Sequence, residues 1–359
     1  MTSPAPLIPG RRQAEGADLL GRDQLVLSPA AAVLFSGARV LVTGAAGTVG
    51  AAIVRRLHGV RPERVYLLDS ETDALVSLAG ELGVYDDIVV ADVRQGAGLE
   101  EIVRALSPDV VVHAAGLGER AHLDGSPAEA LWTNVRGTQN VALAAAEAGV
   151  RLLVHVSADS AGRPASVLGV SKRLAELVVA GLGQDPAGMR TMSVRVGPLL
   201  DGGTGLLQAI ARHGLTGEPV TLRHPDATCP IMTAADAAAL VLEAAALRGP
   251  ARTYVLDAGD HVSAVEFARY LAARVGLPEP EFDYAEVAGA PLVGPTDRAA
   301  VRRTSHPRVW SLPPDEVDAA IAGRLDGLCA LAANADAAEL REALTSTLAA
   351  ATLVEPAGR

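Results

Sequence analysis

A glycine-rich turn between an apolar run and a helical pattern constrains this chain more than any other feature. The apolar run covers residues 39–43, the turn reads Gly44-Ala45-Ala46-Gly47-Thr48-Val49-Gly50, and helical spacing follows over 51–57. Glycines let the chain turn sharply and let a pyrophosphate approach the backbone, and the start of a helix offers free N–H groups and a positive dipole end. Strand, glycine turn and helix in this order predict a dinucleotide site at the start of a βαβ unit.

Apolar strands continue to alternate with helices after this unit. Further strands are expected at 65–68, 87–91, 110–113, 152–157 and 191–195, with helices at 73–82, 99–106, 128–148 and 171–181 between them. Continuous apolar strands separated by helices are typical of a parallel sheet that is covered on both faces, with right-handed crossovers. The predicted fold class is therefore α/β, with a Rossmann-type doubly wound parallel sheet.

The pattern loosens after about residue 197 and predicts further parts of the chain. Helices at 206–212, 234–246 and 264–275, with strands near 220–222 and 253–256, indicate a smaller α/β lobe. The alanine-rich tail is expected to be helical, either as a cap on the core or as an oligomer contact. The expected division is an N-terminal arm at 1–36, an NAD-binding domain at 37–196, a substrate-binding lobe at 197–313 that is interleaved with it, and a helical tail at 314–359.

Composition argues against several classes of function. The 359 residues are 49% apolar and carry a formal net charge of −11. No basic stripe is present, so nucleic acid is not an expected partner. Two distant cysteines and scattered histidines predict no metal site. No apolar stretch is long enough for a transmembrane helix or a signal peptide, so a cytoplasmic protein with reduced thiols and no membrane partner is expected.

Residues at the predicted strand ends indicate which dinucleotide binds. Asp69 ends the second strand about 20 residues after Gly50, where a carboxylate accepts from both ribose hydroxyls and repels a 2′-phosphate. This favours NAD over NADP, although a helix N-cap is an alternative role for Asp69. Asp92, followed by Val93, is placed to meet the adenine or to cap a turn. The small residues of the segment Ala114-Ala115-Gly116 follow the fourth strand, where the cofactor crosses the strand ends.

One lysine stands out among the cations. Of the 31 basic residues, only Lys172 is a lysine. An ammonium is a compact point charge that the broad arginine fork does not replace. The alternative interpretation is a solvated surface lysine, so the position of Lys172 relative to the dinucleotide site is the observation that decides between them.

Several segments together resemble a known family. They are the glycine turn, Asp92-Val93, His113 to Gly116, Thr133-Asn134-Val135-Arg136-Gly137-Thr138, and Ser166 to Glu176, with His224 to Thr233, Val255 to Gly259, Thr304 to Pro307 and, near the start, Asp18 to Arg22. Their pattern resembles the extended short-chain dehydrogenase/reductases. More narrowly, it resembles the CapD-type polysaccharide biosynthesis proteins, which include UDP-N-acetylhexosamine 4,6-dehydratases. The resemblance covers about residues 16–350.

The resemblance implies a reaction and roles for residues. In such enzymes NAD takes a hydride from C4 of the sugar, water leaves from C6, and the hydride returns to C6, so the site needs groups that transfer protons. The family's lysine binds the nicotinamide ribose, and here that position is Lys172. Asn134 lies in a family segment that joins the cofactor site. Asp159 is the expected acid–base residue, and Ser157 is expected to hold the substrate hydroxyl.

The chain departs from the family pattern on the substrate side. Leu168 stands where a tyrosine or methionine is usual, and Ser160 replaces a lysine that is a candidate base at C5. Arg195 is kept, but Pro198 stands where an asparagine would bind the substrate. Because neither leucine nor serine is a general base at neutral pH, the proton transfers would have to use other groups.

Two interpretations of these departures stay open. In the first, the chain is an active NAD-dependent enzyme on a nucleotide-activated sugar or a sugar-like metabolite. Dehydration is then the leading reaction, with epimerisation or simple alcohol oxidation as alternatives, and Glu119 or His122 supplies a further base unless both are solvated loop residues. In the second, catalysis is lost and the chain is an NAD-binding partner protein. The retained Asp159 favours the first. A homo-oligomer is expected only by analogy with folds of this type.

Overall fold

The computed structural model describes most of the chain. The described residues are 25–182, 188–200, 205–222, 224–249, 252–259, 261–285, 301–315 and 321–352. Most of the expected N-terminal arm, including the segment from Asp18 to Arg22, lies outside them.

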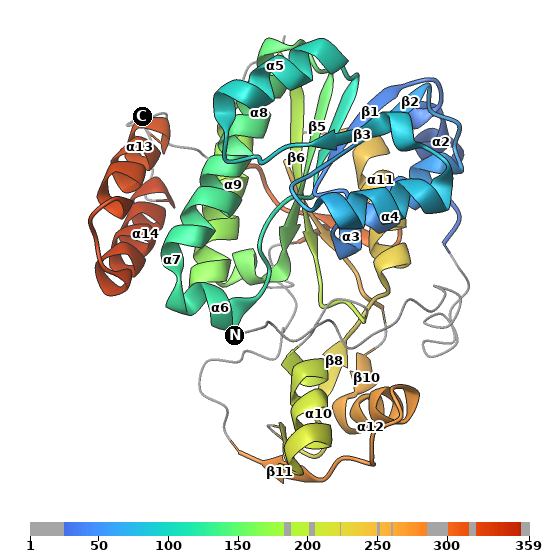
Figure 1. Cartoon of the computed structure of the whole chain (residues 1–359), viewed down its shortest axis with the longest axis vertical. Helices are drawn as coiled ribbons and strands as arrows, with labels where there is room; N and C mark the ends of the chain where they lie inside the picture. The colour runs from blue at the N-terminus through green and yellow to red at the C-terminus, as the bar shows by residue number, and fades with distance from the viewer. Residues whose placement is uncertain are drawn as a thin grey trace.

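A mostly parallel sheet forms the centre of the described fold (Figure 1). It has nine strands in the order β12-β13-β9-β6-β5-β4-β1-β2-β3 within the described residues. Their bounds are β1 Arg39–Thr43, β2 Arg64–Asp69, β3 Ile88–Val90, β4 Val110–His113, β5 Leu152–Ala158, β6 Arg190–Val196, β9 Thr253–Leu256, β12 Arg302–Arg303 and β13 Val309–Ser311. Strands from β9 to β3 pair in parallel, and β13 and β12 add an antiparallel edge. The expected doubly wound sheet is confirmed.

Helices cover both faces of this sheet because successive strand residues point to opposite sides. In β1, Val40 and Val42 join one apolar cluster and Leu41 joins another. The first cluster packs under α2 (Pro29–Phe35), α3 (Thr48–His58), α4 (Thr72–Leu82) and α11 (Ala234–Ala246), and the second under α5 (Gly96–Leu106), α8 (Gly137–Glu147) and α9 (Val167–Leu182). Strands that are apolar on both faces therefore need a helical layer on each side.

The single helix expected at 128–148 consists of three pieces. A short α7 (Pro127–Glu129) leads into the π-helical segment η2 (Ala130–Arg136), and α8 follows. A π-helical turn widens the backbone spiral locally and is frequent at functional sites. Hydrophobic periodicity does not distinguish such a turn from a regular helix, so the sequence pattern missed it.

A smaller lobe carries its own apolar cluster, which includes Ile210, Val220 and Phe267. It contains α10 (Gly205–Thr216), α12 (Ala264–Arg274), β7 (Val220–Leu222), β8 (Thr228–Pro230), β10 (His261–Ser263) and β11 (Phe282–Tyr284), drawn below the main sheet in Figure 1. Helix 234–246 and strand 253–256, expected in this lobe, belong to the main sheet instead, because α11 packs with α3 in the first cluster and β9 pairs with β6. A helix that is apolar nearly all round requires burial on several sides.

The C-terminal tail forms two helices that lie beside α9 (Figure 1). They are α13 (Ile321–Ala332) and α14 (Ala337–Thr352). Their buried side chains share an apolar cluster with α9 and η2, and the tail contributes Ile321, Leu325, Leu328, Leu340, Leu344, Leu348 and Ala351 to it. The tail therefore covers the side of α9 that faces away from the sheet.

We expect Leu344→Ala to lower the free energy of unfolding by about 2–5 kcal/mol, because truncating a buried leucine loses transfer free energy and leaves a cavity. Leu344 is 1% exposed within the cluster that joins α14 to α9. Leu331→Ala on α13 is the matched control, since that leucine is 41% exposed, and it should cost less than about 1 kcal/mol. Urea unfolding measures both, and equal losses would contradict the packing of the tail on α9.

Candidate nucleotide site and acid–base site

The glycine turn between β1 and α3 allows a very close approach of two chain segments. Gly44 has a φ of +70°, and a Cβ on it would overlap the backbone of Ala115 after β4. A Cβ on Gly50 would overlap the carbonyl oxygen of Gly44. Gly47 occupies the N-cap of α3 without a side-chain hydrogen bond, so Thr48 and Val49 begin the helix with N–H groups that no cap side chain occupies. The turn therefore presents backbone donors and a helix start at the strand ends.

A cavity of about 410 Å³ opens at the carboxyl ends of β1 to β4. Among its lining residues are Gly44, Gly47, Asp69, Asp92, Val93, Ala114, Ala115 and Gly116, which the sequence assigned to the cofactor. Glu71, Arg94 and Thr133 also line it and were missed, because they belong to loops and to a helix with no glycine or strand-end signal. A cavity at this edge is where open α/β sheets bind their ligands.

Asp69 is tied to the glycine turn. Its carboxylate accepts from the backbone N–H of Ala46 at 2.9 Å and from that of Glu71 at 3.2 Å. The N-cap position of α4 is Glu71, so Asp69 is not the helix N-cap considered as its alternative role. One oxygen holds the turn in place, and the side chain also lines the cavity. Its contact with a ribose stays a prediction.

Asp92 is held by Arg94. The carboxylate accepts from the Arg94 backbone N–H at 2.9 Å and from its Nε at 2.8 Å. The hydrogen bond from this guanidinium lowers the pKa of Asp92, so the carboxylate stays ionised. The neighbouring Val93 packs closely on Gly137, where a Cβ would come within 2.8 Å of the valine methyl. This turn fixes the cavity wall next to β3.

Asn134 of η2 fixes the loop after β4. Its Oδ1 accepts from Leu117 N at 2.7 Å, while its Nδ2 donates to Leu117 O at 3.1 Å and to Ser171 Oγ at 3.0 Å. Since the π-helical turn carries Asn134, this turn links the loop to α9. The side chain is buried and saturated, so it positions the backbone at the cavity.

Lys172 of α9 lies under the same loop. A Cβ on Gly116 would come within 2.7 Å of Lys172 Nζ and 3.0 Å of Asn134 Oδ1, so a larger residue there would displace the ammonium. Burial lowers the pKa of Lys172 to about 8, and Glu176 partly opposes this shift. Among the described residues, the ammonium has no hydrogen bond or ion pair. The single lysine is thus a buried cation beside the cavity and not a solvated surface residue.

Two buried histidines lie next to Lys172 and were not expected as site residues. The rings of His113 and His155 stack at 5.6 Å between centroids. Thr138 donates to Asn134 O, so it accepts from His113 Nε2, and His113 Nδ1 then accepts from Thr43. Burial lowers the pKa of His113 and lowers that of His155 to about 3, with the Lys172 charge contributing to both. Both rings are therefore neutral.

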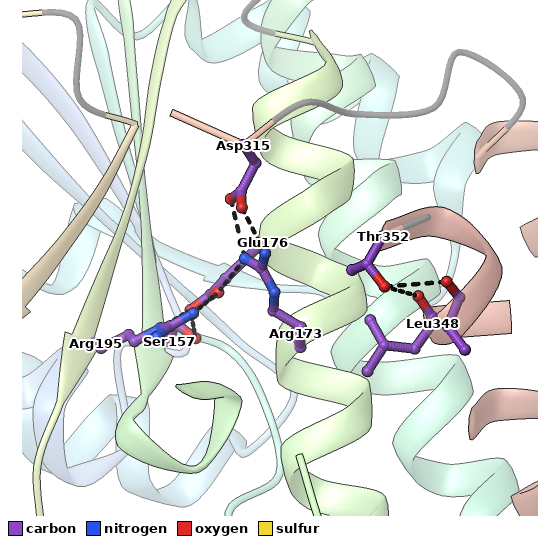
Figure 2. Close-up of polar contacts among 8 residues, drawn as sticks. Ser157, Arg173, Glu176, Arg195, Asp315, Leu348 and Thr352 are labelled. Atoms are coloured by element: carbon purple, nitrogen blue, oxygen red, sulfur yellow. Dashed lines mark hydrogen bonds and ion pairs between the residues drawn. The ribbon is translucent and has the colours of Figure 1, made fainter. Parts of the chain in front are cut away.

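A buried ion network joins β5, β6 and α9 (Figure 2). Glu176 is 0% exposed and accepts from Ser157 Oγ at 2.7 Å, from Arg195 Nε at 2.8 Å and from Arg195 Nη2 at 2.7 Å. Arg173 donates to Glu176 at 3.1 Å and pairs with Asp315 at 2.5 Å. Burial alone would raise the pKa of Glu176, but the hydrogen bonds from Arg195 outweigh it and keep the carboxylate ionised.

Asp159 begins the short helix η3 (Asp159–Gly162) directly after β5. Asp159 Oδ1 and Ser160 Oγ are buried without a hydrogen-bond partner in the part of the chain that the structure describes. Burial raises the pKa of Asp159 to about 7, with Arg195 opposing the shift and Glu176 adding to it. A carboxyl with this pKa gains and loses a proton near neutrality, as general acid–base catalysis requires.

The structure brings together Ser157, Asp159 and Arg195 around Glu176, with Lys172 on the same helix as Glu176. The Ser157 hydroxyl donates its hydrogen bond to Glu176. Its expected contact with a substrate hydroxyl stays a prediction. Ser171 and Glu176 were missed as positioning residues, although both lie in a segment that the family resemblance covers.

The remaining predicted substrate residues are placed differently. Leu168 is buried in the apolar cluster shared with the tail, and Glu119 and His122 are exposed near α6 (Arg120–Gly125). Pro198 contributes its carbonyl, which accepts from Met232 N at 3.2 Å. Contacts of these four residues with a substrate stay predictions.

Among the described residues, no group of three or more histidine, cysteine, aspartate or glutamate side chains is arranged to hold a metal ion. No helix in the same ranges is long and apolar enough to cross a membrane.

Comparison with solved structures agrees with this architecture. Pen from Bacillus thuringiensis superposes with a TM-score of 0.66 at 21% identity, over 78% of this chain and 90% of that one. A DesIV double mutant from Streptomyces venezuelae, described as a dTDP-glucose 4,6-dehydratase with NAD bound, gives a TM-score of 0.60 at 22% identity, over 71% of this chain and 86% of that one. The fold is that of the extended short-chain dehydrogenase/reductases.

The family follows from sequence comparison. The family model described as "Polysaccharide biosynthesis protein" matches residues 40–289. The capsular polysaccharide biosynthesis protein CapD of Staphylococcus aureus is 33% identical over 275 residues, which cover 75% of this chain and 46% of that relative. The chain therefore belongs to the CapD-type polysaccharide biosynthesis family, and it spans about half the length of this curated relative.

The raised pKa of Asp159 has a consequence for stability. Because the folded pKa of about 7 exceeds the unfolded value near 4, ionisation of Asp159 destabilises the fold progressively between these pH values. We expect the free energy of unfolding of Asp159→Asn, relative to the unmodified protein, to increase by about 2 kcal/mol from pH 5 to pH 8. The exposed Asp283→Asn is the control and should show no such trend. Urea titrations at the two pH values measure it, and a constant difference would contradict a buried, protonated Asp159.

Proposed function

We propose that this protein binds NAD and modifies a nucleotide-activated sugar or a sugar-like metabolite. The leading reaction is oxidation at C4 followed by dehydration and internal return of the hydride. The observation that carries the proposal is the buried carboxyl oxygen of Asp159, which has no hydrogen-bond partner among the described residues and lies after β5 at the same edge of the sheet as the cofactor cavity. Perturbed pKa values cluster at functional sites, and burial raises the pKa of this carboxyl to about 7.

The residues of the cavity fit NAD. The glycine turn and the start of α3 suit a pyrophosphate, and Asp69 lines the cavity where an adenosine ribose would lie. Lys172 places its ammonium next to Gly116, and within the described part of the chain this ammonium makes no ion pair or hydrogen bond, which suits a nicotinamide ribose. Bound NAD would supply hydride acceptance and return. Structural relatives such as DesIV, whose description includes NAD, support this assignment.

The chain's own groups would move the protons. Asp159 would accept and return a proton at the sugar, since its carboxyl is half ionised near neutral pH. Arg195 and Glu176 would tune this carboxyl, the first by favouring its ionised form and the second by opposing it. Lys172 would orient the ribose and lend positive charge. Epimerisation and alcohol oxidation begin with the same C4 oxidation and remain alternatives within this proposal.

Two observations favour a second candidate function, a non-catalytic NAD-binding partner protein. Leu168 occupies the family's tyrosine or methionine position and is packed into an apolar cluster. Ser160, in the position of a lysine, has a buried hydroxyl without a described partner. Neither side chain is an acid or base at neutral pH, so this candidate would keep the cofactor site and lose turnover.

Lys172→Ala is expected to weaken NAD binding at least about tenfold, because the ribose loses a buried cationic partner. Lys172→Met keeps an unbranched side chain of similar length and removes only the charge, so it should weaken binding similarly. Arg104→Ala, which removes an exposed cation of α5, is the control and should leave the affinity unchanged. Calorimetric titration with NAD measures all three. Normal affinity in both Lys172 variants would refute the ribose role.

Small molecules released by denaturing the freshly purified protein identify the ligands directly by mass spectrometry. We expect NAD together with a nucleotide sugar. With that sugar as substrate, Asp159→Asn should lower kcat by about 100-fold or more while NAD affinity is retained, since the amide cannot transfer the proton. Unchanged turnover in Asp159→Asn would contradict the acid–base role. Release of NAD without turnover of any nucleotide sugar would favour the non-catalytic candidate.

A further inference from the structure

A second cavity, of about 360 Å³, lies at the edge of the sheet opposite the cofactor cavity. Its walls are residues 247–249 after α11, Tyr254 at the start of β9, residues 302–305 from β12 onward, and residues 311–314 at the end of β13. Since β9 runs parallel to β6, its start marks the amino-terminal edge of the parallel strands. The cofactor cavity lies at their carboxyl ends, so the two cavities are separate.

Three exposed arginines line this second cavity, and none of its described lining residues is acidic. These arginines are Arg248, Arg302 and Arg303. Within the described ranges, none of their guanidinium groups makes a hydrogen bond or an ion pair. Ser305 and Ser311 add hydroxyl groups to the lining. The cavity therefore concentrates unneutralised positive charge in a concave surface, which focuses the potential.

The cluster contrasts with the overall charge of the chain. The protein carries a formal net charge of −11, and some exposed arginines elsewhere pair with carboxylates, as Arg151 does with Asp109 at 3.1 Å. Two further cations, Arg190 and Arg252, lie near Arg248 of this cavity. Burial lowers the pKa of Arg190, Tyr254 opposes the shift, and the charges of Arg248 and Arg252 lower it further. Positive charges gathered without acids repel one another, and a bound anion would offset that repulsion.

The walls of the cavity are held in place by buried contacts. Arg190 donates to Ala245 O at 2.6 Å and to Leu247 O at 2.9 Å, and so it fixes the end of α11. Leu312 N donates to Thr253 O at 2.9 Å, which attaches the segment after β13 to β9. Pro313 and Pro314 then restrict the backbone of that segment. These contacts fix the backbone segments that carry the lining residues.

We propose that this cavity binds a phosphate-bearing small molecule through Arg248, Arg302 and Arg303. Guanidinium groups bind phosphate oxygens through paired hydrogen bonds, and a volume of this size suits a small ligand. The site is independent of the proposed NAD-dependent function, because it shares no lining residue with the cofactor cavity.

Calorimetric titration of the full-length protein with inorganic pyrophosphate at low ionic strength tests the proposal. The expected result is saturable binding that Arg302→Ala combined with Arg303→Ala weakens at least about tenfold, as does Arg248→Ala, because each removes charge-assisted hydrogen bonds. Arg104→Ala is again the matched control and should bind pyrophosphate normally. Unchanged NAD affinity and unchanged melting temperature in the variants would show that the fold and the cofactor cavity are intact.

Titration with UDP separates free phosphate from a nucleotide as the source of the anion. Tighter binding of UDP that is lost in the same variants supports a nucleotide, and equal affinity supports recognition of the phosphates alone. Equal pyrophosphate binding by the unmodified protein and the variants would overturn the proposal, as would no binding by the unmodified protein. Preference for an acidic peptide such as hexaglutamate over pyrophosphate would also overturn it, in favour of a protein partner.

Discussion

The buried carboxylate of Glu176 is the interaction on which the arrangement of the site depends. It holds Ser157 and Arg195 on two neighbouring strands and Arg173 on its own helix. Removing one partner of a buried ion pair costs about 3–5 kcal/mol, because the remaining charge is left buried without compensation. Loss of the donors to Glu176 is therefore expected to destabilise the fold. The ion network therefore fixes how α9 sits on the sheet. Because Lys172 is four residues before Glu176 on this helix, the same constraint sets the position of the ammonium beside Gly116.

A second constraint acts from the other side of the cavity. The backbone of Ala115 approaches Gly44 so closely that no side chain fits between them, and Gly50 approaches Gly44 in the same way. These contacts draw the ends of β1 and β4 together under one cavity. Since parallel strands end at the same edge, Asp159 after β5 lies at this edge too. The order of the strands thus places the cavity beside β1 to β4 and Asp159 beside β5.

Much of this arrangement could be predicted from local patterns. The glycine turn, the strand ends at Asp69 and Asp92, and the importance of the single lysine all carry signals in composition or spacing. The role of Glu176 carries none, since a glutamate on a helix is ordinarily solvated. The stacked rings of His113 and His155 depend on strands that are adjacent only in the folded sheet. Likewise, the second cavity combines Arg248 with the adjacent pair Arg302 and Arg303, which lies more than 50 residues further along the chain, so no local sequence pattern reveals the cluster.

The sequence by itself determined the class of fold and the position of the glycine turn, because hydrophobic periodicity and glycine sterics act over a few residues. Tertiary structure alone decided which polar groups are buried together, and hence which titrate near neutral pH. Asp159 has a raised pKa because packing removes it from water and places Arg195 and Glu176 near it. Tertiary structure also decided that α11 packs on the main sheet, that β9 pairs within it, and that the tail covers α9. Burial and charge proximity are sums over distant segments, so only the folded chain sets them.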